Sequence, residues 1–148
     1  MIVDKLADVM QTVDELTDAF RAQGLRVTPQ RQAIFRLLEG NESHPTVESL
    51  YEAARREMPT ISLKTVYQTV HDLEGMREIE LLDVGTGSVR VDPNIAPHHH
   101  LVCEGCGMIR DVPLELPALD VPAAFRQGFE VGAVEVVFRG RCDRCGGT

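Results

Sequence analysis

The sequence predicts an α+β protein with a mostly helical N-terminal part and a mostly stranded C-terminal part. Apolar residues recur at helical spacing up to about residue 75. Residues 79–92 contain two strand-like segments on either side of a glycine-rich turn, a β-hairpin pattern. After Pro93, several prolines divide the chain into short strand-like pieces. A chain of 148 residues can hold two small domains, and we expect them at residues 1–92 and 93–148.

Composition excludes several classes of protein. Hydrophobic residues make up 43% of the chain, which is enough for a core and excludes wholesale disorder. No stretch approaches the roughly 20 apolar residues of a membrane span, and the N-terminus has no signal-peptide pattern. We therefore expect a cytoplasmic protein without membrane contact. The net charge of −8 excludes general nucleic-acid binding, but residues 26–77 have no acidic excess and are the segment suited to phosphate contacts.

The first predicted helix is an N-terminal extension. Its apolar residues are spaced by three and four positions, and they are Ile2, Leu6, Val9, Val13, Leu16 and Phe20. Gly24 is a suitable residue just beyond its end. This helix either packs on the core or crosses to a partner chain.

Three further helices follow, each opened by a hydroxyl residue suited to the N-cap. These caps are Thr28, Thr46 and Ser62, and the helices they open end near Glu39, Pro59 and Gly75. Residues 79–83 and 88–92 then flank a Gly-Thr-Gly turn and predict a β-hairpin. Three short helices followed by a hairpin resemble a winged helix-turn-helix domain.

The C-terminal part predicts a small mixed domain. Strand patterns occupy residues 101–103, 108–112 and 131–138, and residues 117–127 could hold one helix.

Two C-x-x-C pairs lie in the C-terminal part. They consist of Cys103, Cys106, Cys142 and Cys145. Two such turns can supply the tetrahedral sulfur shell that suits Zn²⁺, and a closed shell leaves no position for substrate. The competing interpretation is a pair of redox disulfides, but the βαβ context of a thioredoxin motif is lacking. The pattern favours a structural zinc site.

Histidines and carboxylates form a second candidate metal site. His98 and His100 alternate, so they point to the same face of a strand. A hairpin with the next strand brings Asp111 beside His100, while Asp92 lies just upstream and His44 begins the second capped helix. A shell of imidazoles and carboxylates without thiolates suits Fe²⁺ or Mn²⁺ and can accept Zn²⁺.

Four motifs together carry a resemblance to a known family. They are RVTPQR at 26–31, SLKTVY at 62–67, HHHLVCEGCG at 98–107 and CDRC at 142–145. In this order they resemble the Fur family of bacterial metal-dependent repressors. The resemblance implies a winged-helix DNA-binding domain, then an α/β dimerisation domain, in a homodimer that binds a palindromic operator in double-stranded DNA. It does not explain the extension before residue 20.

The resemblance also implies two metal sites. The structural Zn²⁺ falls on the four cysteines. A regulatory site between the domains, for Fe²⁺ or Mn²⁺, falls on His44, Asp92, His98, His100 and Asp111. Metal bound there would fix the angle between the domains and favour the closed dimer that fits DNA.

The ligand set resembles the peroxide-sensing branch of this family. That branch has an aspartate where Asp111 stands, whereas the iron-uptake branch typically has glutamate. Its members respond when Fe²⁺ reacts with hydrogen peroxide and a ligand histidine, here His44 or His98, is oxidised. The alternative is an iron-responsive repressor, and zinc, nickel or manganese sensing are further options. Some relatives have an additional metal site that needs a histidine late in the sequence, and residues 101–148 contain none. His99 therefore lacks partner ligands for such a site, and we expect it to be exposed or to support the ligands of the regulatory site.

The resemblance assigns DNA contacts to the helix that Ser62 opens. Tyr67 would contact thymine methyl groups, Arg26 would reach the minor groove, and Gln68 replaces an arginine of many relatives and can read adenine. The full set of expected DNA-binding residues is Arg26, Arg31, Ser62, Lys64, Thr65, Tyr67 and Gln68.

Two other classes of function compete with a repressor. Histidines, aspartates and a divalent metal also describe a small hydrolase or oxygenase. Five protein ligands leave little room for substrate, and no nucleophile–base pair or phosphate loop is visible, so we expect no enzyme. The other class is a zinc-stabilised interaction module that does not bind DNA.

Overall fold

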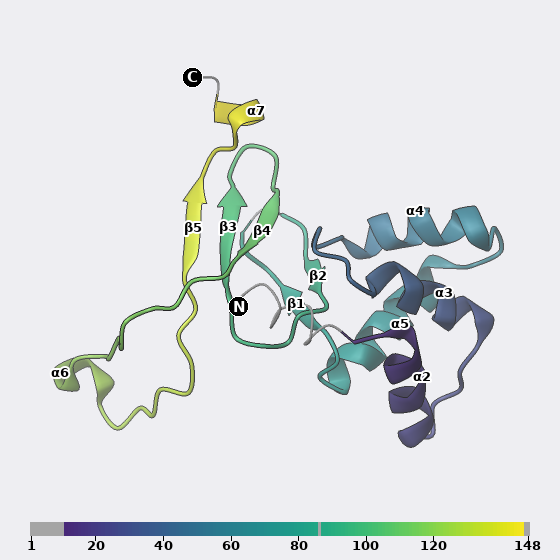
Figure 1. Ribbon diagram of the computed structural model, residues 1–148, viewed down its shortest axis with the longest axis horizontal. Helices are drawn as coiled ribbons and strands as arrows, with labels where there is room; N and C mark the ends of the chain where they lie inside the picture. The colour runs from purple at the N-terminus through teal and green to yellow at the C-terminus, as the bar shows by residue number, and fades with distance from the viewer. Residues whose placement is uncertain (1–10, 86, 147–148) are drawn as a thin grey trace. The chain divides into compact units, whose positions relative to one another are not determined.

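The computed structural model describes residues 11–85 and 87–146 (Figure 1). The chain separates into two compact units, Met1–Ala96 and Pro97–Thr148. The sequence placed this boundary after residue 92, so residues 93–96 belong to the first unit instead of the second. No helix in the described ranges is long and apolar enough to cross a membrane.

Four helices in the first unit begin at hydroxyl N-caps. They are α2 (Val13–Ala22), α3 (Pro29–Leu38), α4 (Val47–Glu57) and α5 (Leu63–Gly75). Thr28, Thr46 and Ser62 each accept a hydrogen bond from a backbone N–H in the first turn, so the three predicted caps are confirmed.

The prediction of one continuous N-terminal helix from Ile2 to Phe20 is wrong at Thr12. Thr12 has extended backbone angles and accepts from the backbone N–H of Glu15, so it opens α2 at Val13. A helix cannot run unbroken through an N-cap, because that residue is not helical. The apolar residues of the predicted stripe from Ile2 to Val9 lie outside the described residues.

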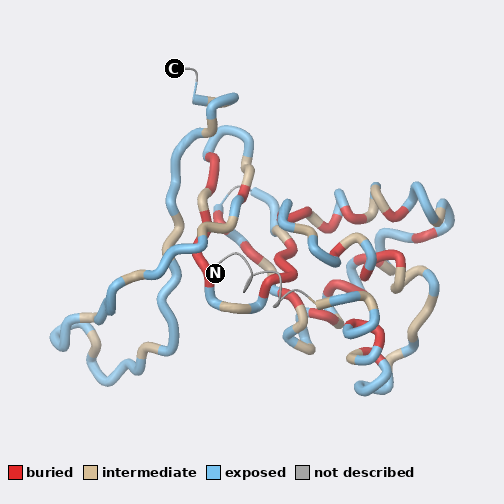
Figure 2. The backbone as a smooth tube through the Cα atoms, viewed as in Figure 1, coloured by how far each residue is buried: buried red, intermediate tan, exposed pale blue. Residues whose placement is uncertain are grey.

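The helices enclose the core of the first unit (Figure 2). Phe20 and Phe35 contact edge to face with ring centroids 5.0 Å apart, and both are fully buried. Val66, Val70 and Leu73 bury one face of α5 in the same core. This packing fixes α5 and leaves its opposite face exposed.

The predicted hairpin is confirmed in the first unit. Strands β1 (Glu80–Leu82) and β2 (Arg90–Asp92) pair antiparallel. The backbone N–H of Val91 donates to the carbonyl of Pro45 at 2.8 Å, which fastens β2 to the segment before α4. Three helices followed by this hairpin make the winged-helix arrangement.

The second unit is built on a three-stranded sheet in the order β4-β3-β5. Strand β3 (His99–Cys103) pairs antiparallel with β4 (Ile109–Val112) and parallel with β5 (Val137–Gly140). Two short helices, α6 (Ala123–Arg126) and α7 (Asp143–Gly146), complete the unit. With the helical first unit, this sheet confirms the α+β class.

Two elements of the second unit differ from prediction. Residues 131–138 were expected to form a strand, but only the last two of them lie in β5. The reason is that β5 pairs with β3 only from His100 onward, so β3 limits its length. The helix expected within residues 117–127 is a single turn, and Gln127 ends it with a φ of 45°.

Candidate metal centres

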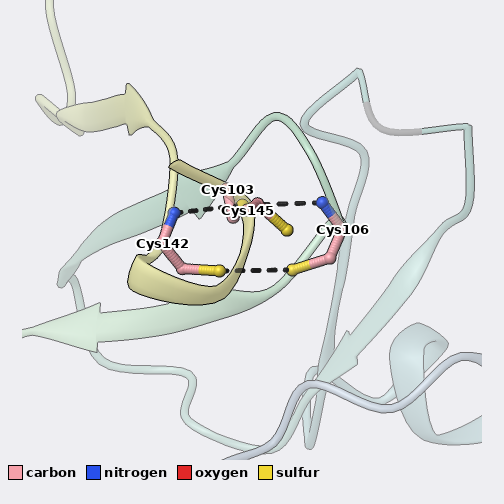
Figure 3. Close-up of side chains that lie close together, drawn as sticks. All are labelled: Cys103, Cys106, Cys142 and Cys145. Atoms are coloured by element: carbon pink, nitrogen blue, oxygen red, sulfur yellow. Dashed lines mark hydrogen bonds between the residues drawn. The ribbon is translucent and has the colours of Figure 1, made fainter. Parts of the chain in front are cut away.

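The four cysteines meet at one end of the sheet in the second unit. Cys103 ends β3 opposite Gly140 of β5, so the parallel pairing carries both C-x-x-C turns to the same place (Figure 3). The Sγ of Cys103 accepts hydrogen bonds from the backbone N–H of Cys106 at 3.5 Å and of Cys142 at 3.3 Å. The Sγ atoms of Cys106 and Cys142 are 3.9 Å apart. No two of the four sulfurs are more than 4.8 Å apart, and all four cysteines are free thiols.

Gly105, between the cysteines of the first pair, allows the two turns to approach. A Cβ at this position would lie 2.7 Å from the Cβ of Cys145 and 3.0 Å from its Sγ. Any larger residue would push the second turn away. Sequence reasoning missed this glycine because the contact depends on the pairing of β3 with β5.

Two thiols of this cluster have pKa values shifted in opposite directions. Hydrogen bonds from the backbone N–H groups of Cys142 and Cys106 lower the pKa of Cys103 to about 6. Hydrogen bonds with Cys142 and Cys106 raise the pKa of Cys145 to about 12. Four thiolates at this spacing would repel one another, and a divalent cation would offset that repulsion. Four sulfurs that lie within 4.8 Å of one another can complete a tetrahedral shell, which leaves no coordination position for substrate and fits a structural zinc ion.

The second unit also contains three members of the predicted regulatory site. The pairing of His100 on β3 with Asp111 on β4 confirms the predicted register. The Nε2 atoms of His98 and His100 lie 3.1 Å and 3.4 Å from the same Oδ1 of Asp111. Both histidines are buried, and their ring centroids are 4.4 Å apart. Two imidazoles thus converge on one carboxylate oxygen.

The first unit contains the other two members. The Nε2 of His44 lies 3.3 Å from Oδ2 of Asp92, and both side chains are 1% exposed. The backbone N–H of Asn94 donates to Oδ1 of Asp92 and orients that carboxylate. His44 was expected to begin a helix, but it precedes the N-cap Thr46 and has a φ of 52°.

The chemistry of these donors fits a divalent cation. Buried carboxylates beside imidazoles are costly unless each charge is paired. Imidazole and carboxylate donors without thiolates suit Fe²⁺ or Mn²⁺.

His99 and Glu135 hold parts of the second unit together. The backbone N–H of Val136 donates to Nδ1 of His99 at 3.0 Å, and His99 is 8% exposed. Of the two alternatives expected for His99, exposure is therefore wrong, and support of the ligands stays a prediction. Sequence reasoning missed Glu135, whose Oε1 lies 2.9 Å from Nδ1 of His100. No sequence signal marks this residue, because only the β3–β5 pairing brings it near.

The expected DNA-binding residues on α5 divide into two groups. Lys64, Tyr67 and Gln68 are exposed on the face opposite the core. The hydroxyl of Tyr67 donates to Oε1 of Glu48 at 2.7 Å, which raises the pKa of Tyr67 and lowers that of Glu48. Ser62, in contrast, is the N-cap just before α5, and its hydroxyl oxygen accepts from the backbone N–H of Thr65 in the first turn.

The two expected arginines lie outside α5. Arg31 donates to the carbonyl of Arg26 at 2.6 Å, pairs with Asp72 at 3.5 Å and lies over the ring of Phe20. Its guanidinium therefore has structural contacts inside the unit, while Arg26 is exposed.

Comparisons with known proteins agree with this architecture. Residues 22–138 match the ferric uptake regulator family. A peroxide-responsive repressor PerR of Staphylococcus epidermidis is 33% identical over 144 residues, which cover 95% of each chain. The structure of the Helicobacter pylori ferric uptake regulator has the same fold, with a TM-score of 0.71 at 19% identity over 92% of this chain and 95% of that one. A zinc-bound manganese uptake regulator has a TM-score of 0.64 at 29% identity over 89% of this chain and 99% of that one.

Proposed function

The chain belongs to the ferric uptake regulator family of metal-responsive regulators, and we propose that it is a DNA-binding repressor that senses peroxide. The observation that carries the proposal is the convergence of His98 and His100 on one oxygen of Asp111, in a cluster without thiolates.

The regulatory metal in this proposal would take ligands from both units. His44 and Asp92 of the first unit and His98, His100 and Asp111 of the second would share one Fe²⁺ or Mn²⁺. Because both units would hold one ion, its binding would restrict their relative movement and select the form that fits DNA. When bound, Fe²⁺ supplies the reduction of hydrogen peroxide beside the histidine ligands, and oxidation of His44 or His98 would end repression.

Two observations support the proposal that the molecule sensed is peroxide. The relative from Staphylococcus epidermidis is named a peroxide-responsive repressor. Residue 111 is an aspartate, which resembles the peroxide-sensing branch, and not the longer glutamate typical of the iron-uptake branch. An iron-responsive repressor would use the same residues, and peptide mass spectrometry after brief peroxide exposure separates the two.

The four cysteines would hold Zn²⁺ as a structural ion. A closed sulfur shell does not exchange ligands with substrate, and the second unit is small for a self-sufficient core. The zinc would therefore stabilise the sheet that carries His98, His100 and Asp111, without responding to the signal itself.

DNA recognition is assigned to the exposed face of α5. Tyr67 and Gln68 offer a ring and an amide to base edges, and Lys64 offers a charge to phosphate. Exposed apolar side chains in the second unit support a homodimer. They include Leu119, Phe125 and Phe129, which are 54%, 79% and 69% exposed. A two-fold dimer requires a palindromic operator.

A mobility-shift assay tests the repressor proposal. The zinc-loaded chain should retain operator DNA when Mn²⁺ is added and release it when Mn²⁺ is removed by a mild chelator. Random DNA of equal length is the control. Equal binding with and without Mn²⁺, or equal binding to both DNAs, would contradict a metal-dependent specific repressor.

A further inference from the structure

We propose that Glu135 is a positioning residue for the regulatory metal site, a role that depends on the function proposed above. Its carboxylate accepts a hydrogen bond from Nδ1 of His100 and fixes the ring so that Nε2 is the nitrogen available to the metal.

The His100 ring lies between two carboxylates. Its Nδ1 is 2.9 Å from Oε1 of Glu135, and its Nε2 is 3.4 Å from Oδ1 of Asp111. The ring is 1% exposed, so no bulk water competes for either nitrogen. Each nitrogen of this imidazole therefore faces a carboxylate oxygen of the protein.

The sheet brings Glu135 to this position. The backbone N–H of His100 donates to the carbonyl of Val136 at 3.1 Å, and Val137 is paired with His100 in the parallel ladder. The residue just before this contact is Glu135. Asp111 comes from β4 on the other side of β3. The two carboxylates thus reach one ring from the two neighbours of the central strand.

The chemistry of the two groups assigns the proton. An ionised carboxylate can only accept hydrogen bonds, and the shorter contact, with Glu135, assigns the one hydrogen of a neutral ring to Nδ1. The lone pair of Nε2 then faces Asp111, an arrangement that a cation between the two would stabilise. A neutral ring in this tautomer keeps its lone pair on Nε2, which is the form that binds a metal. When the lone pair is given to a cation, the ring gains positive charge, and the carboxylate of Glu135 stabilises it.

The half-exposed position of Glu135 fits this role. Its side chain is 49% exposed, whereas His100 and His98 are buried. One carboxylate oxygen can therefore stay hydrated while the other accepts from the ring. This lowers the cost of keeping a charge beside the buried cluster.

Substitutions at Glu135 test the inference in the full-length, zinc-loaded chain. The variants are Glu135→Ala, Glu135→Gln and the matched control Glu130→Ala. Glu130 is exposed, and no hydrogen bond or ion pair is recorded for it in the described part of the chain. The two readouts are Mn²⁺ affinity by titration and the His100 tautomer, read from imidazole nitrogen shifts without Mn²⁺. Zinc content checks the fold of each variant.

We expect Glu135→Ala to lower Mn²⁺ affinity by about 10–100-fold, as is typical when the partner of a ligand histidine is removed. The His100 tautomer should then become mixed, while zinc content stays unchanged. The amide oxygen of Glu135→Gln can still accept from Nδ1, so this variant should keep the tautomer and most of the affinity.

Three outcomes overturn the inference. If Glu135→Ala behaves like Glu130→Ala in both readouts, Glu135 does not position the ring. If Glu135→Gln loses as much affinity as Glu135→Ala while the tautomer is kept, Glu135 is itself a ligand. If the unmodified chain binds no Mn²⁺, the proposed function fails together with this role. If the chain binds Mn²⁺ but substitution of Glu135 does not change the affinity or the tautomer, only this inference is refuted.

Discussion

The cysteine cluster and the proposed histidine–aspartate site differ in which units supply their members. All four cysteines belong to the second unit, and the pairing of β3 with β5 alone brings their two turns together. The histidine–aspartate set is divided, with His44 and Asp92 in the first unit and the other three members in the second. A metal held within one unit can stabilise only that unit. A metal shared by two units can report its presence as a change between them, which is what a switch requires.

The largest expected effect comes from breaking the cysteine cluster. Structural zinc binding is typically worth about 10–16 kcal/mol, which matches or exceeds the net stability of about 5–15 kcal/mol of a whole domain. Cys103→Ser should therefore give a poorly folded second unit without zinc and without dimers. Circular dichroism, zinc content and size-exclusion chromatography measure this. A folded, zinc-free dimer would contradict the structural role.

Breaking the divided site should have a different result. His44→Ala and Asp111→Ala alter residues of different units, yet both should abolish Mn²⁺-dependent operator binding and keep zinc and fold. Each loss should exceed the roughly 10–100-fold typical of changes outside the ligand shell. His71→Ala is the matched control for Mn²⁺ affinity alone, because this exposed histidine lies on α5, the helix to which DNA recognition is assigned. If His44→Ala retains the Mn²⁺ affinity of the unmodified chain, the two members from the first unit do not share an ion with the three from the second.

A smaller change tests how closely the cysteine turns are packed. In Gly105→Ala the new methyl group would lie 2.7 Å from the Cβ of Cys145, and the second turn must move. Overpacking of this kind costs about 1–3 kcal/mol, so zinc affinity and thermal stability should fall without loss of the fold. Gly132→Ala is the control, because a Cβ there meets nothing within 4 Å. Equal melting temperatures for the two variants would argue against a close approach.

The smallest expected effect lies on α5, away from both clusters. The hydrogen bond to Glu48 raises the pKa of Tyr67, so this bond contributes stability at neutral pH and is lost as the pH rises through the raised pKa. Glu48→Gln removes the charge and should let Tyr67 ionise at a lower pH. Tyrosinate absorbance measures this, with Tyr67→Phe to identify the signal. An unchanged titration would mean that Glu48 does not hold the Tyr67 hydroxyl.

Local signals in the sequence predicted the elements that local chemistry determines. Thr28, Thr46 and Ser62 were recognisable as caps because hydroxyl residues satisfy the first backbone N–H groups of a helix. The contact between His100 and Asp111 was predictable because alternation and a hairpin are short-range features.

Long-range pairing explains what the sequence did not reveal. The parallel alignment of β5 with β3 determines the length of β5, the approach at Gly105 and the contact of Glu135 with His100. A parallel partner is separated from its strand by a long connection, so no short motif encodes its register. The internal contacts of Arg31 with Asp72 and Phe20 depend in the same way on helix packing.

Peptide mass spectrometry after brief peroxide exposure tests the central claim, that the divided site senses peroxide through iron. The zinc-loaded chain is compared with Fe²⁺ and with Mn²⁺ in the regulatory site. The account predicts the mass of one added oxygen atom on the peptide with His44 or His98 in the Fe²⁺ form only, together with loss of operator binding. The four cysteines should stay unmodified. Unmodified histidines in the Fe²⁺ form, with operator binding retained, would contradict peroxide sensing and identify an iron-responsive repressor.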